Sequence, residues 1–308
     1  MQKLNQIKEK IESAKIITIF RHIYPDMDAY GSQMGLKLAL LSLYPDKEVY
    51  ALGNMDFYGH TMDIVEDEVV KQSLAIILDT SNAARVDDDR YEIAQDSIRI
   101  DHHVKVETLA NLEWIDDKSS ATCEMLALYF QAMKQTISSQ AAQWLYNGLV
   151  ADSIRFTIDS VRKESFLAAA YLIDQKVDVI QTEIDNFAST LNDFKYENKV
   201  RNRAVLKEKS LTSIMMKKDY EDLHMTFPEA KDKVYALSGI KEIEVWALFT
   251  ENPDGNFNAS LRARTKCIRE IAAQYNGGGH ACASGIKGLN IKQVHEIIDL
   301  LAKRSIED

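Results

Sequence analysis

Cysteine is scarce in this sequence, which holds only three among its 308 residues. Cys123, Cys267 and Cys282 are too few and too widely spaced for a disulfide framework or a cysteine-rich zinc site. Long apolar runs are lacking too, since none approaches the roughly 20 residues that a membrane-spanning helix needs. The first residues, MQKLNQIKEKIESAK, do not have the apolar core of a signal peptide. We therefore expect a soluble, cytoplasmic protein with reduced thiols and no membrane partner.

Positive charge is also in short supply, because 37 lysines and arginines stand against 47 aspartates and glutamates, a formal net charge of −10. This deficit argues against non-specific binding to duplex DNA or to an anionic membrane. It does not exclude a polyanionic substrate, since bound divalent cations can reverse the local field. Hydrophobic residues make up 46% of the chain, which is enough for two cores at this length.

Apolar, strand-like runs alternate with helix-like patterns over the first half of the chain. The strand-like runs are 16–20, 48–52, 73–79 and 97–100, and the helix-like patterns are 28–43, 121–133 and 139–153. Alternation of this kind predicts an α/β fold in which a parallel sheet is flanked by helices.

A further helical region, 162–209, ends in the charged stretch NDFKYENKVRNRAVLKEKS, which has the composition of a solvated connector. We assign a first domain to residues 1–190, a connector helix or linker to 191–207, and a second, smaller α/β domain to 208–308. In the second domain we expect a hairpin around residues 253–256, whose Pro-Asp-Gly-Asn sequence is a turn signal.

Ionisable residues follow three of the strand-like runs. The first run leads into RHIYPDMDAYGSQMG, the third ends at an aspartate, and the fourth ends in Asp101-His102-His103. Because ligands bind outside the carboxyl ends of strands in parallel α/β sheets, we expect these side chains to converge. One more aspartate ends an apolar helical run in GLVADSIRF. The candidate residues are His22, Asp26, Asp28, Asp79, Asp101, His102, His103 and Asp152.

Each of these residues alone has a simpler explanation. An aspartate of the first motif could cap a helix, Asp79 could start a turn, and Asp152 could be a helix-end residue. A lone histidine is more often a satisfied core residue than a ligand. The triplet at 101–103 is harder to explain in this way, since polar groups at a buried strand end are costly without partners. The coincidence of all of them at one predicted edge favours a metal site.

The types of side chain indicate which metal chemistry to expect. Carboxylates and imidazoles without a thiolate favour Mn²⁺ or Mg²⁺ over structural zinc. Five aspartates and several histidines exceed what one ion needs. Two ions about 4 Å apart, bridged by a shared carboxylate, would use them and would suit hydrolysis of a phosphoester. The chemistry thus predicts a two-metal phosphoesterase.

The sequence resembles the DHH phosphoesterases, whose name-giving triplet is Asp101-His102-His103 here. HIYPDMDAYGS is similar to the first motif of that family, LDTSN to the second, IDHH to the third and GLVADSIRF to the fourth. SSATCEML, at 119–126, resembles the stretch after the triplet, and NASLRART and NGGGHACASG resemble the DHH-associated substrate domain. The match covers about residues 15–290. It implies a DHH catalytic domain followed by a DHH-associated domain.

The resemblance implies two divalent ions, with Mn²⁺ expected and Mg²⁺ as the alternative. The first ion would be held by His22, Asp26 and a bridging Asp79. The second would be held by Asp28, Asp79, His102 and Asp152. His103 would face the scissile phosphate, and Asp101 would orient the histidines from behind.

The second domain carries the substrate contacts that the resemblance implies, Arg262 and His280 on a phosphate. The glycine loop can also be interpreted directly, because three glycines allow close approach and their N–H groups could cradle phosphate. A helix C-cap after Tyr275 is the structural alternative, and one of the glycines is expected to serve as that cap as well. Arg264 shares a strand face with Arg262 and is assigned to a base or a second phosphate; a salt-bridged surface is the alternative for both. The expected substrate-binding residues are Arg262, Arg264, Gly277, Gly278, Gly279 and His280.

Ile154 departs from the family pattern, in which a small residue, often glycine, stands two places after the aspartate of the fourth motif. The bulkier side chain could reshape the wall of the pocket without touching the ligands.

The subgroup that this sequence most resembles contains nanoRNases, which degrade very short oligonucleotides, and phosphatases of 3′-phosphoadenosine-5′-phosphate (pAp). We expect hydrolysis of short oligoribonucleotides, of pAp, or of both. Cleavage of cyclic di-AMP or linear dinucleotides is the alternative. A non-catalytic nucleotide-binding regulator on the same fold is a second alternative. A homodimer is the expected assembly, as the commonest one.

Overall fold

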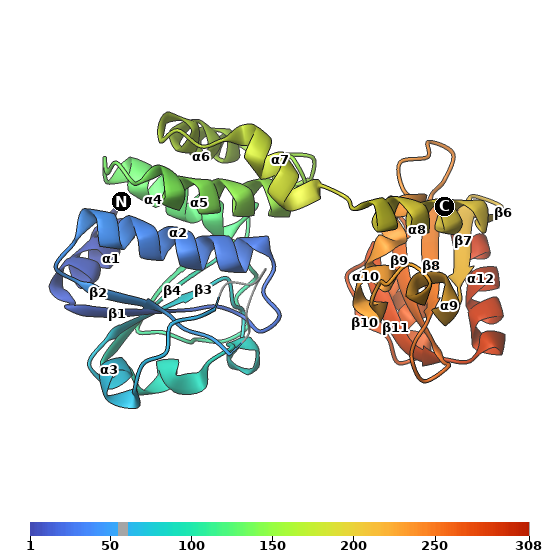
Figure 1. Ribbon diagram of the computed structural model, residues 1–308, viewed down its shortest axis with the longest axis horizontal. Coiled ribbons are helices and arrows are strands. Elements are labelled where there is room, and N and C mark those ends of the chain that lie inside the picture. The colour runs from blue at the N-terminus through green and yellow to red at the C-terminus, as the bar shows by residue number, and fades with distance from the viewer. Residues whose placement is uncertain (55–60, 308) are drawn as a thin grey trace. The chain divides into compact units, whose positions relative to one another are not determined.

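The computed structural model of the protein describes residues 1–54 and 61–307 (Figure 1). The chain divides into two compact units, Met1–Ala188 and Ser189–Asp308. Each unit has its own sheet and its own hydrophobic core. Among the described residues, no helix combines the length and the apolar character that crossing a bilayer would require.

The first unit is built on a five-stranded sheet in which every pair of neighbouring strands is parallel. Its strands are β1 (Ile16–Phe20), β2 (Glu48–Ala51), β3 (Leu74–Leu78), β4 (Asp96–Asp101) and β5 (Leu112–Ile115), in the order β2-β1-β3-β4-β5. β3 is buried along its whole length, as its continuous apolar sequence predicts. The predicted parallel α/β fold is therefore confirmed.

Helices cover both faces of this sheet (Figure 1). The helices that share one core with the sheet are α1 (Gln2–Ser13), α2 (Met27–Leu43), α4 (Thr122–Ala132), α5 (Ser139–Asp152) and α6 (Lys163–Asp174). α7 (Val179–Phe187) packs on α5. A smaller core on the other face includes residues of α3 (Asp67–Lys71) and of the 3₁₀ segment Asp89–Ile93; a further 3₁₀ turn is Ala83–Arg85.

Two glycines let α2 and α5 pack closely enough to form the site. A Cβ on Gly31 of α2 would lie 2.6 Å from the backbone oxygen of Trp144. A Cβ on Gly148 of α5 would lie 2.3 Å from Sγ of Cys123 and 3.2 Å from Cα of Asp28. Because real side chains cannot approach so closely, larger residues here would push the two helices apart.

The second unit contains a six-stranded mixed sheet, in which β7 and β8 are parallel and the other neighbours antiparallel. Its strands are β6 (Val205–Lys207), β7 (Ser210–Met215), β8 (Val245–Glu251), β9 (Phe257–Ala263), β10 (Gly278–Gly279) and β11 (Ala283–Leu289), in the order β10-β11-β9-β8-β7-β6. Its helices are α8 (Leu191–Asn202), α9 (Lys217–Glu221), α10 (Phe227–Lys231), α11 (Arg269–Gln274) and α12 (Ile291–Ile306), with a 3₁₀ segment at Asp232–Leu237. The expected hairpin joins β8 to β9.

The charged stretch at 191–207 forms α8 and β6 of the second unit. Tyr196 and Val200 of α8 are fully buried in a core with Tyr220 and Leu248. Most of the charged residues of this stretch lie at the surface, because a surface helix needs only one apolar stripe to pack.

Candidate metal centre and substrate residues

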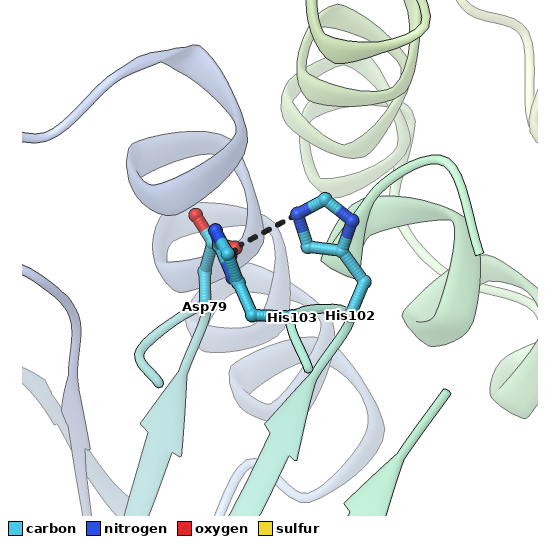
Figure 2. Close-up of side chains that lie close together, drawn as sticks. All are labelled: Asp79, His102 and His103. Atoms are coloured by element: carbon cyan, nitrogen blue, oxygen red, sulfur yellow. Dashed lines mark ion pairs between the residues drawn. The ribbon is translucent and has the colours of Figure 1, made fainter. Parts of the chain in front are cut away.

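The candidate residues of the first unit come together at one edge of its sheet, where β1, β3 and β4 end. Asp79 follows β3, and His102 and His103 follow β4; Figure 2 shows the Asp79 carboxylate facing the ring of His102. Asp152 reaches the same place as the last residue of α5. Three groups there have potential ligand atoms within 4.8 Å of one another: His22, Asp26 and Asp79; Asp28, His102 and Asp152; and Asp79, His102 and His103.

Asp26 combines the two roles that its position in the sequence leaves open. Its Oδ1 accepts the backbone N–H groups of Asp28 and Ala29, 3.1 and 3.0 Å away, and so caps α2. Its Oδ2 lies 3.6 Å from Nε2 of His22. Nδ1 of His22 is 2.9 Å from the carbonyl oxygen of Ile23, so Nδ1 carries the proton and Nε2 is left to face the carboxylates. A helix cap and a metal ligand are thus compatible in one side chain.

Asp28 is 1% exposed, and its carboxylate is held by the start of another helix. Its oxygens accept the N–H groups of Thr122 at 2.7 Å and of Cys123 at 2.9 Å, the first two residues of α4. The N-terminal end of a helix favours a negative charge. These bonds fix the orientation of the carboxylate, whose Oδ2 lies 3.8 Å from Nε2 of His102.

Asp79 occupies the centre of the site, because its two oxygens face three imidazoles, Oδ2 that of His22 and Oδ1 those of His102 and His103. Oδ2 lies 3.4 Å from Nε2 of His22, and Oδ1 lies 3.3 Å from Nε2 of His102. Thr122 Oγ1 donates to the same Oδ1 at 3.2 Å. A carboxylate in this position could be shared between two ions.

His102 faces the second group of carboxylates. Its Nδ1 is 3.2 Å from the backbone oxygen of Ser119, which leaves Nε2 to face Asp28, Asp79 and Asp152. Nε2 lies 3.4 Å from Oδ2 of Asp152.

Two carboxylates of the centre are hard to ionise. Burial, followed by the charge of Asp79, raises the pKa of Asp28 to about 7. Burial and the charge of Asp28 raise the pKa of Asp152 to about 8. Burial pushes the pKa of Asp79 upward as well, but hydrogen bonds from His102 and His22 outweigh it and lower that pKa. The cluster holds more negative charge than its buried surroundings tolerate.

The imidazoles compensate by binding protons. Burial lowers the pKa of His22, but its hydrogen bonds to Asp26 and Asp79 outweigh that effect and raise the pKa to about 10. Burial also lowers the pKa of His102, but its hydrogen bond to Asp79 and the charge of Asp28 outweigh that effect and raise the pKa to about 11. Divalent cations would replace these protons, and the donors are oxygens and nitrogens without a thiolate. The residues present therefore fit divalent metal ions.

His103 differs from the other two histidines in its exposure and in its hydrogen-bond partner, although its Nδ1 also lies 3.5 Å from Oδ1 of Asp79. Its side chain is 39% exposed, and Nδ1 lies 2.8 Å from Oδ1 of Asp101. The backbone N–H of His103 donates to the same oxygen at 3.1 Å. Burial opposes ionisation of Asp101, but the hydrogen bonds from His103 and Arg99 outweigh it and lower the pKa of that carboxyl. With Nδ1 occupied, Nε2 of His103 is the nitrogen left to face a substrate.

Arg262 and Arg264 have different surroundings in the second unit. Nη2 of Arg264 donates to the carbonyl oxygen of Ile240 at 3.0 Å and lies 3.4 Å from those of Lys241 and Ile243, so this arginine tethers the turn at 240–243. Arg262 is half-buried, and burial lowers its pKa. In the part of the chain that the structure describes, no carboxylate lies within ion-pair distance of its guanidinium. A half-buried cation of this kind is suited to pairing with a substrate anion.

The glycine-rich stretch is a β-hairpin, and not the loop that its composition suggests. Gly278 pairs with Gly285 and Gly279 with Ser284 in the β10–β11 ladder. The N–H of His280 donates to the carbonyl of Ala283 at 2.8 Å, which closes the tight turn between the strands. His280 lies exposed at this turn.

The helix cap before this hairpin combines an asparagine in the left-handed region with a glycine that contributes its N–H group, so a glycine takes part in the cap as expected. Asn276 has φ of 57°, in the left-handed region that asparagine tolerates better than most residues. The N–H of Gly277 then bonds the carbonyl oxygen of Ala272 in α11 at 2.8 Å.

Only Gly278 among the three glycines has open space where a side chain would stand. A Cβ on Gly277 would lie 2.4 Å from the oxygen of Gly285, and a Cβ on Gly279 would lie 2.5 Å from that of Ala283. A Cβ on Gly278 would meet nothing within 4 Å. The fold itself requires the outer two glycines, whereas Gly278 leaves open space beside its backbone.

Ile154 follows Asp152 closely and has φ of 46°, with Arg155 at 57° and Phe156 at 61°. A β-branched residue in the left-handed region is strained, which is a physical reason for a small residue at this place. The side chain is 54% exposed.

Two residues that contact the metal centre, Thr122 and Arg85, are not among the candidates that the sequence indicates. Thr122 binds Asp28 through its N–H and Asp79 through its hydroxyl, and the SSATCEML stretch is the signal that could have indicated it. Nη2 of the exposed Arg85 lies 3.4 Å from Nδ1 of His22. Its position six residues after Asp79 carries no recognisable pattern, so only the structure reveals this contact.

Comparison with known proteins places the chain in a family. Residues 16–149 match the DHH family, N-terminal domain, and residues 224–306 match the DHHA1 domain. A Bacillus subtilis protein named bifunctional oligoribonuclease and PAP phosphatase NrnA is 32% identical over 276 residues, which covers 87% of this chain and 88% of the relative. The chain belongs to the DHH family. As a member it is a metal-dependent hydrolase of phosphoester bonds.

Two further similarities extend over almost the whole chain. A Streptococcus mutans protein named probable bifunctional oligoribonuclease and PAP phosphatase NrnA is 30% identical over 305 residues, covering 96% of this chain and 97% of the relative. The crystal structure of an exopolyphosphatase-related protein from Bacteroides fragilis superposes with a TM-score of 0.86 at 22% identity, covering 99% of this chain and 98% of that one. The structural likeness concerns the fold alone.

Proposed function

We propose that this DHH-family enzyme hydrolyses very short oligoribonucleotides and pAp, using two divalent ions, with Mn²⁺ as the physiological choice. The observation that supports two ions most directly is Asp79, whose two oxygens face two separate groups of ligands. The substrates follow from the names of the relatives in Bacillus subtilis and Streptococcus mutans.

In this proposal the first unit is the catalytic domain. His22, Asp26 and Asp79 hold one ion, and Asp28, Asp79, His102 and Asp152 hold the other. The ions would supply Lewis acidity toward water and the phosphoryl oxygens. His103 faces the substrate phosphate through Nε2, while Asp101 keeps its ring in place.

The second unit is the proposed substrate domain. Arg262 supplies a positive charge that no carboxylate of the described residues pairs with, and the open space beside Gly278 leaves room for a phosphate next to the backbone. His280 is exposed beside it. Arg264 has a weaker claim to a base or second phosphate, because its Nη2 lies near three backbone carbonyl oxygens, whereas the guanidinium of Arg262 donates to that of Leu261.

A substrate panel tests the proposal. We expect turnover of pAp and of RNA dimers to pentamers with Mn²⁺, and slower turnover with Mg²⁺. Dimers to pentamers should be cleaved at least about tenfold faster in kcat/KM than an RNA of about 24 nucleotides, a difference of roughly 1.4 kcal/mol. The net charge of −10 offers a long strand no general electrostatic attraction.

Other results would point to the alternatives. Equal rates on short and long RNA would contradict the preference for short substrates. Cyclic di-AMP cleaved faster than every linear substrate would make the chain a cyclic dinucleotide phosphodiesterase. Binding of pAp without turnover of any phosphoester, in protein loaded with metal, would indicate a non-catalytic regulator.

A further inference from the structure

Arg99 is a completely buried arginine in a strand of the central sheet. It lies on β4, two residues before the DHH triplet, and its side chain is 0% exposed. Its strand neighbours Ile98 and Ile100 belong to the core beneath the helices, so alternation puts Arg99 on the opposite face together with Asp101. A buried guanidinium is costly unless its N–H groups are used, so its partners indicate what it is for.

The partners of Arg99 are Asp101, the first residue of the DHH triplet, and the segment that follows the triplet. Nη2 donates to Oδ2 of Asp101 at 2.5 Å. Nη1 donates to the backbone oxygen of Glu107 at 2.9 Å and lies 3.4 Å from Oε1 of Glu113. The same Oε1 accepts the N–H of Leu109 at 2.8 Å. One side chain therefore ties Asp101 to the backbone at 107–109 and to β5.

The two oxygens of Asp101 are divided between two tasks. Oδ2 is occupied by Arg99, and Oδ1 receives both the Nδ1 and the backbone N–H of His103. A carboxylate held at one oxygen cannot rotate about its χ2 angle without losing that bond. The orientation of the His103 ring, which Figure 2 shows beside Asp79, therefore depends on a contact that His103 does not make itself.

We propose that Arg99 is a positioning residue for the hydrolytic reaction, which fixes Asp101 and through it the tautomer and direction of the His103 ring. The expected effect on kcat rests on the proposed function, because it can be measured only if the protein hydrolyses a phosphoester. Among the described residues Arg99 contacts none of the proposed metal ligands, so its loss should lower kcat while metal content and KM stay close to the wild-type values.

The test compares Arg99→Met with a matched variant of the same network, Glu113→Gln. Arg99→Met removes the bond to Asp101, and Glu113→Gln removes the other carboxylate beside Arg99 but leaves that bond in place. Arg99→Met should lower kcat at least about tenfold, with KM within about twofold and metal content unchanged. Glu113→Gln should lower the melting temperature yet keep kcat within about twofold.

A second readout needs no turnover. In ¹⁵N NMR spectra of the metal-free protein, His103 should carry its proton on Nδ1 in the wild type and in Glu113→Gln. In Arg99→Met it should exchange between tautomers. A wild-type protein inactive on every phosphoester would contradict the proposed function, while the spectra would still decide the role of Arg99.

Two results would overturn the inference. One is a loss of kcat in both variants in proportion to their loss of melting temperature, because Arg99 would then be purely structural. The other is an unchanged His103 signal in Arg99→Met. If that variant does not fold, Arg99→Met/Glu113→Gln, which leaves one fewer buried carboxylate unpaired, takes its place with the same expected kcat, KM and tautomer results.

Discussion

Asp79 combines two features that are unfavourable for folding. Its carboxylate is 2% exposed, and its backbone φ of 52° lies in the left-handed region. Strain of this kind persists only where the surrounding structure holds it, and it gathers at functional sites. The contacts to His22, His102 and Thr122 hold Asp79 in this strained conformation.

Replacing Asp79 by alanine should remove both metal positions, since one side chain serves both groups. We expect Asp79→Ala to bind less metal per chain than the wild type at both positions and to lose turnover by at least about a hundredfold. Elemental analysis of the purified protein, alongside kinetics on one RNA dimer, measures both effects. Asp89→Ala, an exposed aspartate of the 3₁₀ segment, is the control for the change in charge. Full metal content in Asp79→Ala would contradict the bridging role.

Ile154 offers a test of backbone strain beside the same centre. Glycine adopts φ of 46° without a steric penalty, so Ile154→Gly should raise the free energy of unfolding by about 0.5–1 kcal/mol. Ile184→Gly, in the exposed part of α7, should instead lower it by about 0.5–1 kcal/mol. Urea unfolding of both variants decides the question. A destabilised Ile154→Gly would show that packing of the side chain outweighs the strain.

At the scale of elements, the site depends on where helices and strands end. The start of α4 holds Asp28, the end of α5 delivers Asp152, and Asp26 caps α2 while facing His22. In the second unit the β10–β11 hairpin presents Gly278 and its neighbour His280. Element ends are suitable places for such residues because their backbone groups are not all used within the element.

In the β10–β11 hairpin, Gly277 and Gly279 leave no room for a side chain, whereas Gly278 does. Gly279→Ala should destabilise the protein, because its φ of 134° and the 2.5 Å approach to Ala283 exclude a side chain. Gly278→Ala should leave the melting temperature within about 2 °C but raise KM for pAp about tenfold, since a methyl group would block the phosphate. Metal content should not change in either variant. Wild-type KM in Gly278→Ala would remove this backbone from the proposed substrate site.

For the molecule as a whole, the shifted pKa values of the metal centre predict how the stability of the metal-free protein depends on pH. The raised pKa values of Asp28 and Asp152 mean that the folded state binds more protons than the unfolded one between about pH 4 and pH 7–8. His22 and His102, with pKa values of about 10 and 11, act in the same direction above about pH 6.5. These groups therefore lose their contribution to stability as the pH rises through these windows.

Metal should reverse this trend, because the ligands bind a cation only in their deprotonated forms. We expect the melting temperature in a chelator to fall from pH 5 to pH 8, and the increase caused by Mn²⁺ to grow over the same range. Calorimetry in two buffers of different ionisation enthalpy should show protons released on binding. An equal increase at pH 6 and pH 8 would contradict the assignment of these residues as ligands.

The sequence by itself determines which chemical groups stand at the ends of which strands. Apolar runs of strand length, each followed by carboxylates or imidazoles, were enough to predict the parallel sheet and the gathering of His22, Asp79 and His102 at one edge. These signals are local, since strand periodicity and the residues at a strand end are read within about ten positions. The glycine-rich stretch shows the limit, because its composition is the same for a loop and for a tight hairpin.

Tertiary structure alone decided which atom faces which. The division of the Asp79 oxygens, the hold of α4 on Asp28 and the bond from Arg99 to Asp101 join side chains by strand register and helix packing. Register and packing depend on contacts between residues far apart in the chain, and no periodicity within a segment records them. The sequence thus placed the groups at one edge, and the packing of α2, α4 and α5 on the sheet set their geometry.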